Sequence, residues 1–143
     1  MQHIDYNAIR IIRYGKLIDK AILENRYSLA THLAYRCILE YHRLFLRFRM
    51  PHTRTIRHNA FQLSLLTVKY MRARRTLTMQ RTRQLFNMLR STYYLTNLSG
   101  TKFADRDLHV DLATATFARD QAMAISKFLF GSLSEEQKYR EKG

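Results

Sequence analysis

The sequence predicts an all-α protein, folded as a single five-helix up-and-down bundle. The chain has 143 residues, the size of one domain, and 46% of them are hydrophobic, so it can bury a core. One proline and four glycines are too few turn residues for a β-sandwich. Apolar residues recur at steps of three and four, the spacing of one helix face. We expect the bundle over residues 1–131 and a polar C-terminal tail over residues 132–143.

The first two helices are predicted over residues 4–24 and from Ser28 to the residue before Pro51. Ser28 is a residue type that caps helix starts, and a proline pushes the preceding residue out of helical geometry. The short gap between the helices predicts an antiparallel pair, with the single cysteine as an inert core thiol. The apolar stripes are Ile4, Ala8, Ile11, Ile12, Ile18 and Ile22, then Ala30, Ala34, Cys37, Ile38, Tyr41, Phe45 and Phe48.

Three more helices are predicted over residues 59–74, after the cap candidate Thr78, and over residues 111–130. Residues 95–108 break the helical period and contain Ser99-Gly100, so they predict the longest loop. Gly131 predicts the end of the last helix. The residues expected inward are Phe61, Leu65, Leu66 and Val68, then Leu85, Phe86, Leu89 and Tyr93, and finally Leu112, Ala115, Ala118, Ala122, Ile125 and Leu129.

The net charge of +14 is concentrated in the middle of the chain. Residues 36–90 hold thirteen Lys/Arg against one Asp/Glu, whereas residues 1–35 hold five against three and residues 91–143 hold seven of each. Such a block repels itself unless an anionic partner neutralises it. We therefore expect RNA or a nucleotide as a partner, or a protein with an acidic surface.

Several function classes lack their sequence signals. No stretch approaches the ~20 apolar residues that span a bilayer, and charges interrupt any secretory signal, so we expect a cytoplasmic, intracellular protein with no membrane contact. No histidine pair with a carboxylate has ligand spacing, and no glycine-rich phosphate loop occurs, so we expect no metal site and no cofactor. His32, His42, His3 and His109 are interpreted as structural or surface residues.

Arginine outnumbers lysine in the basic block, and the planar guanidinium suits phosphate oxygens and stacking on bases. Because no sequence-reading motif accompanies the charge, we expect binding directed by backbone or shape. Tyr70, Tyr93 and Tyr94 could add stacking surface, but aromatics at helical spacing more often belong to the core. The predicted nucleic-acid-binding residues are Arg43, Arg49, Arg57, Arg72, Arg74, Arg75, Arg81, Arg83 and Arg90.

Four motifs occur in order within residues 16–130. They are AILENRYSLATHLAYRCILEYHRLFL with Glu40 near its middle, RTIRHNAFQLSLL, LFNMLRSTYYLTNLSG and ARDQAMAISKFLF. Their order resembles the HEPN family, the higher eukaryotes and prokaryotes nucleotide-binding domains. The resemblance implies a helical bundle that is usually a homodimer. It also implies one of several activities, because the family includes RNA-cleaving toxins paired with nucleotidyltransferases, non-catalytic nucleotide binders and accessory domains.

Active HEPN members carry an arginine, four to six intervening residues and a histidine. Carried onto this chain, the resemblance implies Arg47 with His52, and Arg54 with His58, as catalytic candidates. Phe48 and Pro51 depart from the motif in the first pair, and the second pair has three intervening residues. A histidine near pKa ~6.5 with an arginine can cleave RNA without metal. The alternative is a basic loop in which the histidines cap the third helix, and we favour it over catalysis.

Two further function classes remain open. The chain could be a non-enzymatic structural or assembly subunit of a ribonucleoprotein, such as an organellar ribosome, with its basic face against RNA. It could also be an antitoxin-like adaptor that binds an acidic protein. Aggregation of the isolated chain would favour the structural subunit, and a stable isolated dimer would favour the HEPN-like protein.

Overall fold

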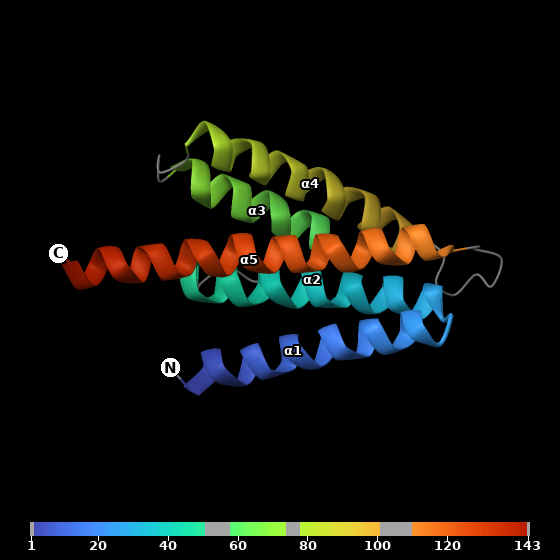
Figure 1. Ribbon diagram of the computed structural model, residues 1–143. Helices are drawn as coiled ribbons and strands as arrows, with labels where there is room; N and C mark the ends of the chain where they lie inside the picture. Colours follow the sequence, from blue (N-terminus) through green and yellow to red (C-terminus); the bar gives the residue numbers. More distant parts are fainter. Residues whose placement is uncertain (1, 51–57, 74–77, 101–109, 143) are drawn as a thin grey trace.

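The computed structural model describes the backbone of residues 2–50, 58–73, 78–100 and 110–142, and the side chains of residues 13–50, 58–73, 78–97 and 110–129. Within these ranges all regular structure is helical (Figure 1). The predicted all-α five-helix bundle is therefore confirmed. None of the described helices is both long enough and apolar enough to cross a membrane. The helices are α1 (Gln2–Leu23), α2 (Tyr27–Arg49), α3 (Ala60–Ala73), α4 (Met79–Gly100) and α5 (Leu112–Lys142).

The turn between α1 and α2 is a Schellman motif centred on Asn25. The N–H of Arg26 donates to Ala21 O (2.8 Å) and the N–H of Asn25 donates to Ile22 O (3.0 Å). Asn25 has a φ of 60°, a left-handed conformation that asparagine tolerates better than most residues. Arg26 is the N-cap residue of α2 and makes no side-chain cap. The predicted cap at Ser28 is therefore wrong, because Ser28 already lies inside the helix.

The starts of α3, α4 and α5 have side-chain caps. Asn59 and Gln62 form a capping box, in which each side-chain oxygen accepts from the other residue's backbone N–H (2.8 and 2.9 Å). The predicted cap at Thr78 is confirmed, since its Oγ1 accepts from the N–H of Arg81 at 3.2 Å. Asp111 Oδ1 accepts from the N–H of Thr114 at 2.8 Å. These caps satisfy N–H groups that have no partner within the helix.

Two helices continue past their predicted ends. α4 extends through residues 95–100, which were predicted to be loop, and α5 passes Gly131 and continues to Lys142. The predicted helix end at Gly131, where the C-terminal tail was expected to begin, is therefore wrong. A glycine inside a helix costs only about 1 kcal/mol, and Glu, Gln and Lys, which are good helix formers, follow it. Local propensity thus outweighs the stop signal.

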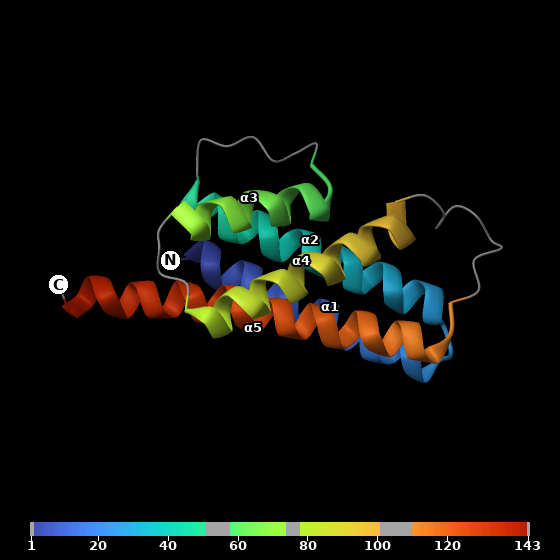
Figure 2. The same ribbon diagram turned by 90° about the horizontal axis from the view of Figure 1, so that it is seen from above.

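α2 and α3 lie parallel, so the chain does not follow a strict up-and-down order. Three contacts fix their direction, and each joins residues 25 apart. The N–H of Ala60 donates to Tyr35 Oη (3.4 Å), and two further contacts join His42 to Thr67 and Phe45 to Tyr70. Figures 1 and 2 show both helices running the same way, with α4 returning antiparallel to α3. The C-terminal ends of α2 and α3 and the start of α4 therefore lie at the same end of the bundle.

The core is centred on α2, which contacts each of the other four helices. The predicted stripe of α2 is buried from Ala30 to Phe45, although Phe48 at its end is 41% exposed. Small residues on α2 and α5 let the two helices approach closely, and the predicted α5 stripe is buried from Ala115 to Leu129. Cys37 is buried, and burial raises the pKa of its thiol to about 11, which agrees with an inert core thiol.

The predicted inward faces of α3 and α4 are wrong at several positions. Leu65, Phe86 and Tyr93 are 44%, 59% and 52% exposed, and Leu112 at the start of α5 is also exposed. Smaller or more flexible residues occupy the inner faces instead. The buried residues are Ala60, Leu63, Ser64, Thr67 and Met71 on α3, and Leu85, Met88, Ser91, Thr92, Leu95 and Thr96 on α4.

Candidate nucleic-acid interface

Five predicted RNA-contacting or catalytic arginines gather where α2 and α3 end and α4 begins. Because α2 and α3 are parallel and α4 is antiparallel to them, residues 47–49, 72 and 81–83 come to one end of the bundle (Figures 1 and 2). We refer to this region as the basic end, and define it as Arg47, Arg49, Arg72, Arg81 and Arg83. The side chains of Arg47, Arg72 and Arg83 are exposed, and the other two are half-buried.

The helices that form the basic end contain almost no acid. α3 and α4 contain no Asp or Glu, and α2 contains only Glu40. Glu40 lies 3.9 Å from Arg43, so this predicted RNA contact is held in an ion pair about one turn before the basic end. Arg47 and Arg72 sit in the last turns of their helices, where cations also interact favourably with the helix dipole. The helix dipole accounts for a cation at the end of each helix, but it does not account for five arginines at one end of the bundle.

The two described catalytic candidates, Arg47 and His58, belong to different predicted pairs, and the structure places them apart. Ala60 contacts Tyr35, and twelve residues separate Tyr35 from Arg47, a rise of about 18 Å along α2. His58 lies two residues before Ala60. Its side chain is half-buried at the start of α3. The remaining predicted residues, which are His52, Arg54, Arg57, Arg74 and Arg75, lie outside the described residues.

His42 is a structural histidine, as predicted. It is fully buried, and its Nδ1 lies 3.2 Å from Thr67 Oγ1. The Thr67 hydroxyl donates its proton to Leu63 O (3.0 Å), so Nδ1 must be the protonated nitrogen that donates to Thr67. Nε2 therefore carries a lone pair, buried with no hydrogen-bond partner among the described residues. Burial lowers the pKa of His42 to about 3, which keeps the ring neutral at physiological pH.

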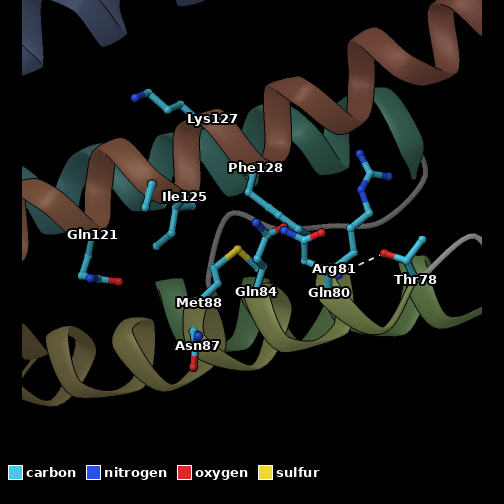
Figure 3. Close-up of a pocket in the computed structure, with 11 residues that line it drawn as sticks. Thr78, Gln80, Arg81, Gln84, Asn87, Met88, Gln121, Ile125, Lys127 and Phe128 are labelled. Carbon is cyan, nitrogen blue, oxygen red and sulfur yellow. Dashed lines mark hydrogen bonds between the residues drawn. The ribbon is translucent and has the colours of Figure 1, made fainter.

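A groove that the sequence analysis missed lies between α4 and α5 (Figure 3). One hollow of about 870 Å³ and a second of about 680 Å³ adjoin at Asn87 and Gln121, which line both, and we call the two hollows together the α4–α5 groove. The first hollow is lined by amide side chains and apolar side chains, including Gln80, Gln84, Met88 and Phe128. Gln80, Gln84 and Asn87 recur at helical steps, a polar stripe that was a readable signal in the sequence.

Two of the three tyrosines considered for stacking are exposed. Tyr93 and Tyr94 are 52% and 48% exposed, so assigning them to the core is wrong, whereas Tyr70 packs against the core. The Tyr94 ring meets Phe117 of α5 edge to face, with centroids 5.8 Å apart, at the second hollow of the groove. Arg90 lines the same hollow. This predicted RNA contact therefore lies beside an exposed aromatic pair, away from the basic end.

No cluster of three or more metal-ligating side chains occurs among the residues that the structure describes. Comparison with family models, curated proteins and solved structures finds no match for this chain. The functional proposals that follow therefore rest on the geometry and on the sequence resemblance.

Proposed function

We propose that this protein is a HEPN-like helical protein that binds RNA through the basic end. The observation that carries the proposal is the parallel packing of α2 and α3, because it brings five arginines from three helices to one end of the bundle. Arginine clusters of this kind contact phosphates without reading base sequence. The homodimer implied by the family resemblance is part of the proposal.

A salt series of RNA binding tests this function. The variant Arg47→Gln/Arg72→Gln/Arg83→Gln removes three exposed charges from the basic end. Each lost phosphate contact lowers the salt slope by about 0.7 for a single strand, so the slope should fall by about 2, together with a large loss of affinity at low salt. Fluorescence anisotropy with a labelled RNA measures both quantities.

The matched control is Lys16→Gln/Lys20→Gln/Arg26→Gln, which removes the same charge from exposed positions on α1 and its following turn. Its affinity and salt slope should stay close to those of the wild type. Equal losses in the two variants would mean that RNA responds only to net charge, and the proposed interface would be rejected.

The proposal is for binding without cleavage. Both predicted arginine–histidine pairs depart from the motif of the active family members, which supports this choice. The same reactions, sampled over time on a denaturing gel, test it. RNA should stay intact with the wild type, and cleavage that disappears in a His52→Ala/His58→Ala variant would instead identify a ribonuclease.

A structural subunit of a ribonucleoprotein is the second candidate, and one observation favours it. The α3–α4 pair exposes the large apolar side chains Leu65, Phe86, Tyr93 and Met79, and exposed apolar groups that gather on a surface mark contacts with a partner. Sedimentation of the purified chain separates the candidates. A stable dimer supports the HEPN-like protein, whereas aggregation that is relieved by added RNA supports the structural subunit.

A further inference from the structure

The α4–α5 groove has the dimensions of a site for an extended ligand. Its lining on α4 runs from Thr78 to Tyr94, a rise of about 24 Å along the helix axis. Its two hollows each fall within the range of about 300–1,000 Å³ typical of ligand pockets. Two adjoining hollows spread over this length suit a flexible chain better than a compact small molecule.

The charges that line the groove favour an anion. Arg81 and Lys127 line the first hollow, which has no acid among its described lining residues, and Arg90 lines the second. Among the described residues that line the second hollow, Asp111 is the single acid, and its carboxylate already accepts the N–H of Thr114 as the cap of α5. The cationic groups belong to the two ends of the groove, and the amides of Asn87 and Gln121 lie between them.

The groove also offers exposed aromatic surface. Tyr94 and Phe117 are 48% and 39% exposed, although both belong to packed helices and contact each other. Phe128 extends from α5 toward α4 at the first hollow (Figure 3). Aromatic rings in a positively charged groove are how proteins bind unpaired bases, because every base has a face that can stack.

The amide side chains of the groove can form hydrogen bonds with any of the four bases. Each of Gln80, Gln84 and Asn87 carries both a donor and an acceptor on one face of α4. Such groups can pair with the edges of any unstacked base. A duplex hides the Watson–Crick edges and the ring faces of its bases, because the bases are paired and stacked inside the helix.

We propose that the α4–α5 groove holds unpaired bases of single-stranded RNA, which stack on Tyr94 and Phe117 while their phosphates contact Arg81 and Arg90. This inference rests on the proposed RNA-binding function and goes beyond it by naming the strand state of the ligand. The basic end then binds the backbone of any RNA, and the groove selects unpaired segments.

The test compares two ligands and three proteins. The ligands are an oligouridylate of about twelve nucleotides, within the site sizes of single-strand binders, and its duplex with oligoadenylate. The proteins are the wild type, Tyr94→Ala/Phe117→Ala, and Phe86→Ala, which removes an exposed ring of α4 that lines neither hollow. The wild type should prefer the single strand, and the double variant should lose about tenfold or more of that affinity. Phe86→Ala should bind as the wild type does.

Crosslinking gives an independent readout that does not depend on the folding of a variant. Oligouridylate carrying 4-thiouridine, irradiated with the wild-type protein, should attach to peptides of α4 and α5 that contain Tyr94 or Phe117. Equal affinity for the two ligands, an unchanged double variant and crosslinks confined to the basic end would overturn the inference and leave the proposed function intact. Absence of binding to either ligand would reject both.

Discussion

The layer of α1, α2 and α5 and the α3–α4 pair pack by different means. In the layer, apolar side chains point inward, and Ile38, Ile125 and Leu129 are at most 1% exposed. In the α3–α4 pair, buried hydroxyl groups such as Ser64 and Thr67 bond to helix carbonyls, while Leu65 and Phe86 face outward. The layer therefore resembles an ordinary domain core, and the pair presents apolar and cationic groups to the outside.

The difference separates the surface that stabilises the fold from the surface that is available to partners. α5 shows both in one helix. Ala118 and Ala122 are buried, whereas Phe117 and Gln121, one residue before each, line the α4–α5 groove. Substitutions on the first face should change the free energy of unfolding, and substitutions on the second should change binding. Three predictions test this division.

The largest effect is expected from Leu129→Ala, on the buried face of α5. Leu129 is 1% exposed, so truncation removes buried area and leaves a cavity, at a cost of about 2–5 kcal/mol in the free energy of unfolding. Met123→Ala is the matched control on the same helix, since Met123 is 52% exposed and should change stability by about 0.5 kcal/mol or less. Urea denaturation measures both, and similar losses would break the proposed contrast between the faces.

An intermediate effect on the free energy of unfolding is expected when the pH is lowered, because His42 is buried between α2 and α3. Its folded-state pKa of about 3 is below the unfolded value of 6.5, so the unfolded chain takes up a proton first as the pH falls. The stability is therefore fully present above pH 6.5 and is lost progressively toward pH 3. Between pH 7 and pH 5 the loss should be about 2 kcal/mol.

The measurement is urea denaturation at both pH values for the wild type and His42→Leu. The variant should lack this part of the pH dependence, while His32, whose pKa is lowered mainly by burial, still adds a loss of the same sign in both proteins. An identical pH dependence in the two proteins would show that His42 is hydrated or charged in the folded state.

The sequence predicts the buried faces better in the layer of α1, α2 and α5 than in the α3–α4 pair. On α2 and α5 the three- and four-residue spacing identifies the buried face. On α5 that face is mostly alanine, and the larger Phe117 and Met123 are exposed. On α3 the spacing favours Phe61 and Leu65, but the buried face holds Ala60, Leu63 and Ser64, which suit close packing against α2. Hydrophobicity alone does not identify which face of α3 is buried. Close contact between helices is also favoured by small side chains and by hydroxyl groups that have hydrogen-bond partners.

The candidate site could be predicted in composition but not in arrangement. The charge block identified the arginines, yet whether Arg47 meets Arg72 or His58 depends on the direction of α3 relative to α2. Three tertiary contacts set that direction, among them the one between Tyr35 and Ala60. No local pattern encodes such a contact. The α4–α5 groove was missed for the same reason, since Asn87 and Gln121 are distant in sequence.

The smallest predicted effect concerns helix starts, and it compares α3 with α2. In the α3–α4 pair, Asn59 caps α3 through its bond to the N–H of Gln62, so Asn59→Ala should cost about 1 kcal/mol of unfolding free energy. In the layer, Ser28 is exposed inside α2 and caps nothing, so Ser28→Ala should be neutral or stabilising by a few tenths of a kcal/mol, because alanine is the better helix former. Thermal or urea denaturation of the two variants measures these changes in stability. A loss in Ser28→Ala equal to that in Asn59→Ala would mean that α2 starts at the position its sequence suggests, and that the Schellman turn at Asn25 does not define the start of the helix.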